Sequence, residues 1–259
     1  QHLAGPWRRL WEILDRKRIP AQHHRFHCRI TRLVSGREST TSAGAACSLY
    51  GSPTPPLPAP VPFAHTLTME NHAERRVLLA TGNPGKVREF RRLLEPFGIA
   101  ALTPADLGLS LDVAEDGATY TENAVTKARA FAAAGRMTAL ADDSGIEVDA
   151  LGGRPGMYSA RYGGPGLDDA GRVALMLSEL EAIPDERRTA RYRAVVAIAF
   201  PGETAPPVAF EGIQEGRIGH APRGDRGFGY DPIFLLADGR SQAEATDDEK
   251  DCISHRAQA

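Results

Sequence analysis

The segment from residue 77 to residue 94, VLLATGNPGKVREFRRLL, constrains the fold more than any other part of the chain. Residues 77–80 form an apolar run with the length of a buried strand, which stops at a polar loop over residues 81–86. Beyond the loop, apolar residues recur at helical spacing until Pro96 and Gly98 end the segment. The pattern therefore predicts a strand, a glycine loop and a helix in succession.

The loop has the residues that a polyphosphate site needs. A helix that begins after a glycine loop presents backbone N–H groups at its positive end, and Thr81, Asn83 and Lys86 add a hydroxyl, an amide and a cation. The loop is not a P-loop, because GxxxxGK[ST] requires Gly at position 80 and Ser or Thr at 87, where this chain has Ala80 and Val87. It is either a different phosphate loop or a plain connector.

Charge is distributed unevenly along the chain. The 259 residues contain 31 Lys and Arg against 33 Asp and Glu; residues 1–68 carry 9 basic and 3 acidic ones, which leaves 22 and 30 from residue 69 onward. An acidic body argues against nucleic-acid binding through bulk charge. If such a body handles triphosphates, a divalent metal is expected to neutralise them.

Composition also bears on location. There is no apolar run of about 18 residues that could span a membrane, and no apolar core of a secretory signal near residue 1. The three cysteines, Cys28, Cys47 and Cys252, suggest neither a disulfide framework nor a zinc ribbon. We expect a cytoplasmic protein without a membrane partner.

Residues 1–68 differ in character from the rest. They include the proline-rich stretch SPTPPLPAPVP, which buries too little apolar surface to order itself. An amphipathic helix around Trp7 and Trp11 and a metal cluster in HHRFHC at 23–28 are the alternatives. We expect residues 1–68 to be a disordered extension, Met69 to be the natural start, and residues 69–259 to form the folded domain.

Carboxylates follow at two places. The string DVAEDG at 112–117 precedes a predicted helix with Thr119 and Glu122 as its capping box, which sets Glu115 before the helix and Lys127 two turns inside it. A short strand at 138–141 is followed by a turn that begins with two adjacent aspartates, at 142 and 143. At the carboxyl edge of a sheet, Asp143 and Glu115 would suit Mg²⁺ together with water and phosphate. A solvated turn is the alternative for the aspartates.

Two later blocks complete the candidate site. In GFGYDPIF at 227–234, glycines flank Phe228 and Tyr230, so that a ring could lie open as a stacking platform for a base, although ordinary core aromatics would read the same. A second Thr-x-x-Glu box at 246–249 opens a helix with Lys250, His255 and Arg256, which are candidate donors to phosphate and to a purine carbonyl. A solvated, cation-rich helix end is the alternative.

Five blocks in this order, ATGNPGKVREF, AEDGATYTENAVTKARA, ALADDSGIEVDALGGRPGMYSARYGG, GFGYDPIF and EKDCISHRAQA, resemble the inosine triphosphate pyrophosphatase family, also described as XTP/dITP diphosphatases. The resemblance covers residues 77–259. It implies an elongated α/β fold with a mixed central sheet and flanking helices, two lobes with the active site in the cleft between them, and a homodimer. It also implies Mg²⁺-dependent hydrolysis of ITP, dITP and XTP to the monophosphate and pyrophosphate, which keeps them out of DNA and RNA.

The resemblance assigns roles to residues whose positions match the family's motifs. Asp143 corresponds to the general base and, with Glu115, to the metal ligands. The implied substrate contacts, to which Lys127 is added as a further cation for the triphosphate, are Thr81, Gly82, Asn83, Pro84, Gly85, Lys86, Lys127, Ser144, Phe228, Gly229, Tyr230, Asp231, Lys250, His255 and Arg256. Selectivity for a 6-oxo purine would arise because Arg256 and His255 donate to that oxygen, whereas adenine presents an amino group there.

Two departures from the family pattern stand at the C-terminus. The family usually has Gly where this chain has Ala257, and its last helix normally continues well past Ala259. We expect a shortened helix to weaken the packing behind His255 and Arg256, and so substrate affinity or dimer stability.

Two other functions remain open. The related septum-inhibitor class cleaves modified pyrimidine nucleotides, but its loop carries a Ser-Pro-Arg-Arg type string that is absent here. A nucleotide-binding module without catalysis would bind inosine triphosphate and release no pyrophosphate.

Overall fold

The computed structural model of the chain describes residues 75–259. The predicted disordered extension, the start at Met69, the possible helix around Trp7 and the cluster at 23–28 lie outside the described residues. Among residues 75–259, no helix combines the length and the apolar character that crossing a membrane requires.

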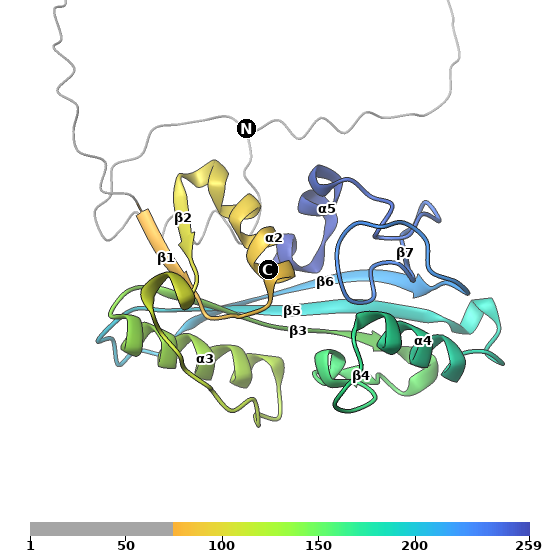
Figure 1. Ribbon diagram of the computed structural model, residues 1–259, viewed down its shortest axis with the longest axis horizontal. Coiled ribbons are helices and arrows are strands. Elements are labelled where there is room, and N and C mark those ends of the chain that lie inside the picture. Colours follow the sequence, from red (N-terminus) through yellow and green to blue (C-terminus); the bar gives the residue numbers. More distant parts are fainter. Residues whose placement is uncertain (1–74) are drawn as a thin grey trace, which may run out of the picture. The chain divides into compact units, whose positions relative to one another are not determined.

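A mixed sheet forms the centre of the fold (Figure 1). Its strands follow the order β2-β1-β3-β5-β6-β7, and β4 pairs with β3. Their bounds are β1 (Arg75–Leu79), β2 (Ile99–Leu102), β3 (Ala139–Val148), β4 (Pro155–Gly156), β5 (Thr189–Ala199), β6 (Val208–Ile218) and β7 (Phe234–Leu235). β1 runs parallel to β2 and β3, and the remaining pairs are antiparallel.

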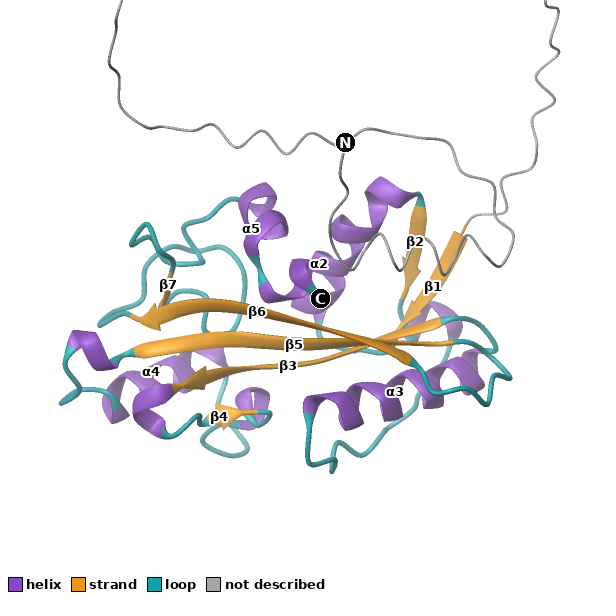
Figure 2. Cartoon of the chain, turned by 180° about the vertical axis from the view of Figure 1, so that it is seen from behind, coloured by secondary structure: helices purple, strands orange, loops and turns teal. Residues whose placement is uncertain are grey.

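Helices cover both faces of this sheet (Figures 1 and 2). The α-helices are α2 (Pro84–Leu94), α3 (Tyr120–Gly135), α4 (Asp169–Glu179), α5 (Asp247–Ile253) and α6 (His255–Gln258). Short 3₁₀ helices are η1 (Glu95–Phe97), η2 (Ala105–Leu107), η3 (Asp149–Leu151), η4 (Ser159–Arg161) and η5 (Asp185–Arg187). α3 and α4 lie on one side of the long strands, and α2, α5 and α6 lie on the other. The predicted α/β class, with a mixed sheet and flanking helices, is confirmed.

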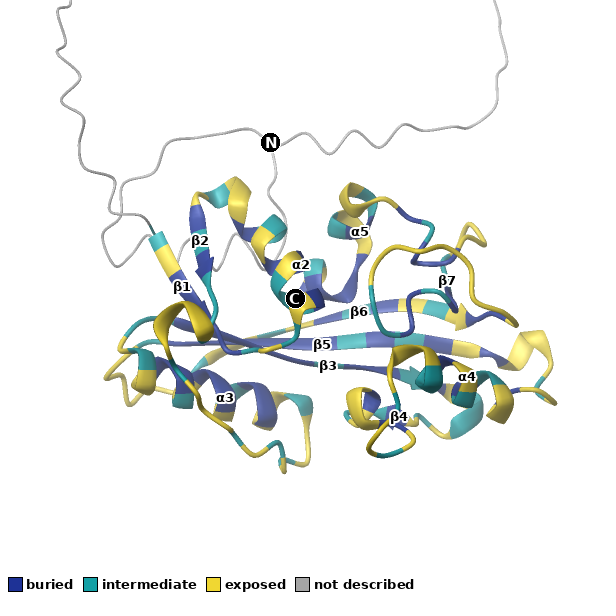
Figure 3. Cartoon of the chain, in the orientation of Figure 1, coloured by how far each residue is buried: buried dark blue, intermediate teal, exposed yellow. Residues whose placement is uncertain are grey.

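The apolar run that ends at the glycine loop becomes the buried strand β1, as predicted. Because strand side chains alternate, Val77 and Leu79 enter the cluster that includes Phe90 of α2, whereas Leu78 and Ala80 enter the cluster around α3. A third cluster, which includes Val173 and Phe234, lies at the other end of the long strands. Figure 3 shows that buried residues are concentrated along the central strands. β1 therefore packs against α2 on one face and α3 on the other, so that both helices that carry candidate site residues lie against the same sheet.

The helix starts follow the sequence signals. Thr119 is the N-cap of α3 and its hydroxyl accepts a hydrogen bond from Glu122 N at 3.1 Å. Thr246 and Glu249 form a complete capping box at the start of α5. β5 and β6 form a long antiparallel pair, from Thr189 opposite Arg217 to Ile198 opposite Val208.

The turn expected after residue 141 is wrong. β3 continues from Ala139 to Val148, so Asp142 and Asp143 lie inside the strand, opposite Val196 and Val195 of β5. Buried carboxylates are tolerated there because cations from distant segments contact them. The strand that follows the aromatic segment is short, since β7 has only two residues.

Candidate active site

The loop at 81–86 holds its own shape through side-chain hydrogen bonds. Asn83 is the N-cap of α2, and its Oδ1 accepts from the backbone N–H groups of Gly85 at 2.8 Å and Lys86 at 3.2 Å. Thr81 Oγ1 accepts from Asn83 N at 3.1 Å. The two first-turn N–H groups are therefore bonded to Asn83 and are not free for an anion, which corrects the expectation from the sequence.

The loop also lies against the aromatic segment. A Cβ added to Gly85 would lie 2.4 Å from the ring of Phe228, closer than carbon atoms approach each other. Only glycine fits at this position, so the contact of α2 with the 227–234 segment depends on Gly85. The structure thus brings together two sequence blocks that are more than a hundred residues apart.

Lys86 and Lys127 meet at Asp142. Lys86 Nζ lies 2.7 Å from Asp142 Oδ2 and 3.5 Å from the Asp142 carbonyl oxygen, to which Lys127 Nζ donates at 2.9 Å. Lys127 Nζ also lies 2.9 Å from Glu115 Oε1 and 3.5 Å from Asp143 Oδ1. The structure therefore places both lysines and both predicted metal-binding carboxylates around one point on β3.

Asp143 is almost fully enclosed, with 4% of its surface exposed. Its Oδ2 accepts a hydrogen bond from Asn123 Nδ2 at 3.0 Å. Burial raises the pKa of Asp143 above the ordinary value, and this outweighs the lowering by Lys127 and by the Asn123 hydrogen bond. A carboxylate with a raised pKa is a stronger base than a solvated one, provided that the pH keeps it ionised.

Glu115 titrates in the opposite direction. Burial acts to raise its pKa, but the hydrogen bond and charge of Lys127, with smaller effects of Lys86 and Arg161, lower it overall. Arg161 Nη2 lies 3.5 Å from Glu115 Oε2. Glu115 is therefore held ionised beside Asp143.

The two carboxylates fit a magnesium ion in donor type and number. Both reach the single ammonium group of Lys127, so their oxygens face a common space. Mg²⁺ is usually bound by one or two carboxylates, with substrate phosphates and waters completing its shell. Among residues 75–259, no group of three or more His, Cys, Asp and Glu side chains could hold a metal ion by itself. The two carboxylates would thus supply part of the metal's shell and leave the rest to water and substrate phosphates.

The C-terminal cations are buried and paired with acids. Lys250 Nζ lies 2.6 Å from both Glu89 Oε1 and Asp231 Oδ2. Arg256 donates from Nε to Asp142 Oδ1 at 3.3 Å and from Nη1 to Glu89. Its Nη2 donates to Asp142 Oδ2 at 3.4 Å and to Ser144 Oγ at 2.9 Å. Because Arg256 is 2% exposed, donation to a purine carbonyl would require that one of these bonds be exchanged.

His255 is buried beside them and stacks on Tyr192, with ring centroids 4.7 Å apart. Burial and the charge of Arg256 lower the pKa of His255 well below its usual value, so the ring is neutral. Within the described part of the chain, its Nδ1 has no hydrogen-bond partner.

Phe228 and Tyr230, which the sequence presents alike, have different surroundings. The Phe228 ring lies over Lys250 and Arg256, with its centroid 5.2 Å from Lys250 Nζ and 5.8 Å from Arg256 Cζ. Tyr230 is buried and donates to the Ser159 carbonyl oxygen at 2.8 Å. Tyr230 is therefore a core residue, and the expected open platform is reduced to Phe228.

Asp231 is likewise an internal residue. It is 3% exposed, and it accepts hydrogen bonds from Tyr192 Oη at 3.1 Å and from Phe228 N at 2.9 Å in addition to Lys250. Its side chain is placed to hold Phe228 and Lys250.

Sequence reasoning assigned no function to Glu89, Asp142 or Asn123. Glu89 follows Lys86 by three residues and Asn123 precedes Lys127 by four, so each lies on the same helical face as a lysine that the sequence singled out. That spacing could have identified both. Asp142 differs, because a strand places neighbouring side chains on opposite faces and its partners come from other segments.

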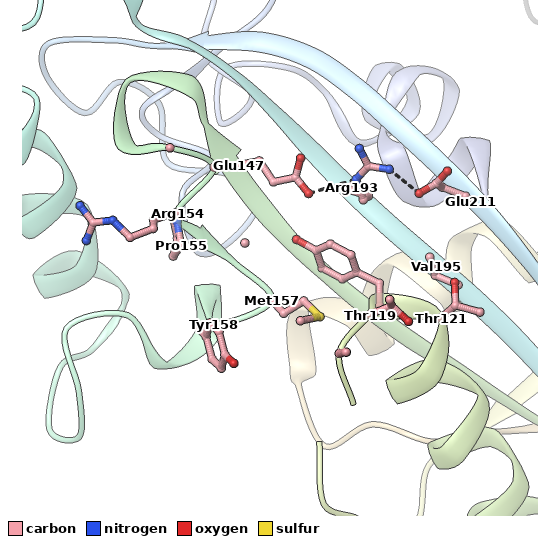
Figure 4. Close-up of a pocket in the computed structure, with 15 residues that line it drawn as sticks. Thr119, Thr121, Glu147, Arg154, Pro155, Met157, Tyr158, Arg193, Val195 and Glu211 are labelled. Carbon is pink, nitrogen blue, oxygen red and sulfur yellow. Dashed lines mark hydrogen bonds and ion pairs between the residues drawn. The ribbon is translucent and has the colours of Figure 1, made fainter. Parts of the chain in front are cut away.

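Two cavities lie near these residues. A cavity of about 450 Å³ borders Gly85, Glu89, Phe228 and Lys250, next to the C-terminal cations. A second, of about 590 Å³, lies between the start of α3 and the loop at 152–158. Figure 4 shows the Glu147, Arg193 and Glu211 ion pairs along its wall.

The sequence model of the Ham1 family matches residues 77–259. The chain belongs to the Ham1 family. Among curated relatives, the dITP/XTP pyrophosphatase of Bacillus subtilis (strain 168) is 49% identical over 186 residues, which cover 71% of this chain and 93% of that protein. The dITP/XTP pyrophosphatase of Symbiobacterium thermophilum is 50% identical over 189 residues, which cover 72% and 92%.

Solved structures of Ham1 proteins agree with the fold. A HAM1 protein from Coxiella burnetii matches with a TM-score of 0.64 at 39% identity, covering 71% of this chain and 93% of that one. A nucleoside-triphosphatase, named dITP/XTP pyrophosphatase, from Mycobacterium abscessus matches with a TM-score of 0.57 at 42% identity, covering 70% and 94%. The family resemblance stated from the sequence is confirmed.

Proposed function

We propose that this Ham1 family member is a nucleoside triphosphate pyrophosphatase that hydrolyses ITP, dITP and XTP to the monophosphate and pyrophosphate with Mg²⁺. The observation that carries the proposal is the meeting of Lys86, Lys127, Glu115 and Asp143 around Asp142 on β3. The names of its relatives, dITP/XTP pyrophosphatase, support the same substrates.

In the proposed reaction, Asp143 orients a water molecule and takes its proton as the water attacks the α-phosphorus. The bond to the leaving pyrophosphate breaks, and Lys86 and Lys127 oppose the charge that develops on it. A divalent cation held by Glu115 and Asp143 would supply further neutralisation of the triphosphate. The pairing of Lys127 with both carboxylates keeps these groups in place before the substrate binds.

Base selection is proposed to involve Phe228, Lys250, His255 and Arg256. Phe228 provides the stacking surface, at the edge of the 450 Å³ cavity. Arg256 and His255 would donate hydrogen bonds to the 6-oxo group of the base. To do so, Arg256 must give up one of its bonds to Glu89, Asp142 or Ser144. Adenine offers no acceptor at that position, so the hydrogen bond that Arg256 gives up would not be replaced.

The wider setting is also a proposal. We propose that the enzyme acts as a homodimer in the cytoplasm, without nucleic-acid or membrane partners, and removes non-standard purine nucleotides before polymerases use them. The acidic balance of residues 69–259 fits a small-molecule substrate better than a polyanion.

Pyrophosphate release from inosine, xanthosine, adenosine and thymidine triphosphates in Mg²⁺ tests the proposal. We expect release from the first two. Preference for thymidine triphosphate would favour the septum-inhibitor class, and inosine triphosphate binding without release would favour a binding module.

Asp143→Asn should lower kcat by about 10²- to 10⁴-fold, because it removes the general base, while nucleotide affinity is retained. Calorimetric titration with nucleotide and a pyrophosphate assay measure the two effects. Asp238→Asn, in an exposed turn, is the matched control. Undiminished turnover by Asp143→Asn would refute the assignment of Asp143.

A further inference from the structure

Asn123 is a buried amide with both ends bonded. It lies on α3, one turn before Lys127, and is 3% exposed. Its Nδ2 donates to Asp143 Oδ2 at 3.0 Å and also lies 3.9 Å from the Met157 sulfur, while its Oδ1 accepts from Gly117 N at 2.9 Å. Because the backbone N–H of Gly117 is the donor to one end of the amide and a carboxylate oxygen of Asp143 is the acceptor at the other, the orientation of the amide follows from its partners.

These two bonds connect the segments that carry the two predicted metal ligands. Gly117 belongs to the loop of Glu115, and Asp143 belongs to β3. The contact with Gly117 is close, since a Cβ added there would lie 2.7 Å from Asn123 Oδ1. The side chain of Asn123 therefore sets the distance between the Glu115 loop and the strand.

The bond to Asn123 also makes the two oxygens of Asp143 unequal. Oδ2 is occupied by the Asn123 amide, whereas Oδ1 faces Lys127, which in turn contacts Glu115 Oε1 at 2.9 Å. An amide that grips one carboxylate oxygen fixes the rotation of the group and directs the other oxygen. Oδ1 thus points to the space that Glu115 shares.

The geometry points to Asn123 as a positioning residue that holds Asp143 Oδ2 and the Glu115 loop, so that Asp143 Oδ1 and Glu115 face one divalent cation and the reacting water. This inference rests on the proposed function for the reaction, but the cation affinity that it predicts can be measured without a nucleotide. Removal of the Asn123 amide should disturb the orientation of Asp143 more than it weakens nucleotide binding, because the proposed nucleotide contacts are made by other residues.

The test uses two variants. Asn123→Leu has a similar size but cannot form hydrogen bonds, and Asn123→Ala adds no bulk, so it serves if the leucine variant fails to fold. Glu122→Gln is the matched control: it is the neighbouring, exposed residue, and it keeps an acceptor for Ala118 N. Mn²⁺ affinity without nucleotide, measured by electron paramagnetic resonance, is the decisive reading, accompanied by kcat, KM and the urea midpoint.

We expect Mn²⁺ affinity and kcat to fall by about 10- to 100-fold in both Asn123 variants, with KM little changed and the control unaffected. An unchanged Mn²⁺ affinity in a folded Asn123 variant would overturn the inference. So would losses of affinity and kcat no larger than those of the control. If the unmodified protein released no pyrophosphate, the proposed function would fail, whereas the Mn²⁺ comparison would still decide the role of Asn123.

Discussion

The phosphate half of the candidate site (Lys86, Lys127, Glu115 and Asp143) and the base half (Phe228, Lys250, His255 and Arg256) hold their cations differently. In the phosphate half, the side chain of Lys86 is 17% exposed and contacts Asp142, whereas that of Lys127 is 8% exposed and contacts Glu115 and Asp143. In the base half, the side chains of Lys250 and Arg256 are 5% and 2% exposed, and each contacts two carboxylates. Asp142 joins the halves, because it binds both Lys86 and Arg256.

The difference separates groups that are ready to bind from groups that must first change partners. Lys86, which water partly reaches, can turn from Asp142 to a phosphate at small cost. A buried cation between two carboxylates is a structural element as well as a candidate ligand, because removing it leaves buried charge unpaired. Lys250 and Arg256 should therefore contribute more to stability, and Lys86 more to the rate.

The largest expected contrast is between Lys250→Met and Lys86→Met. The first leaves Glu89 and Asp231 without their shared cation and should lower the free energy of unfolding by about 3–5 kcal/mol. The second leaves Asp142 still paired with Arg256, so its main effect should be on kcat. Urea unfolding and pyrophosphate release measure the pair, and equal stability losses would erase the distinction between the halves.

A smaller effect is expected from removing the ring that faces the base. Phe228→Ala should weaken stacking by about 1–3 kcal/mol and raise KM accordingly. Tyr230→Phe, which loses only the hydrogen bond to Ser159, is the aromatic control and should affect stability alone, by about 1 kcal/mol. Should KM respond equally to both, Tyr230 would belong to the base half after all.

The smallest expected effect is on the stability of the protein at acid pH. Burial acts to raise the pKa of Glu89, but the charges of Arg256 and Lys250 lower it from 4.5 to about 2. A depressed pKa contributes stability above pH 4.5 that is lost as the pH falls toward 2. Burial raises the pKa of Asp231, and this opposes the effect, so the net slope should be modest.

Glu89→Gln should make the stability less dependent on pH in that window, as measured by urea midpoints from pH 5 down to about 2. Asp112→Asn, at an exposed carboxylate outside the site, is the control. A slope identical to that of the unmodified protein would show that Glu89 does not carry the acid sensitivity of the base half.

Local signals in the sequence predicted the local structure well. The strand, glycine loop and helix of residues 77–94 and the caps at Thr119 and Thr246 depend on residues within a few positions of one another, so their physics is contained in a short string. The charged candidates were harder to place. From the sequence alone, Arg256 is expected to be an exposed cation at a helix end, because its partners on α2 and β3 are distant in the chain.

The sequence by itself determined the family, the opening strand, loop and helix, the capped helix starts, and the residue types that gather at the site. Only the tertiary structure decided that β3 passes straight through Asp142 and Asp143, that Tyr230 is core while Phe228 is not, and that Asn83 uses the helix N–H groups. The reason is that a buried charge or ring takes its environment from partners far away in the chain. Asp142 and Arg256 are 114 positions apart, and no periodicity of the sequence records their contact.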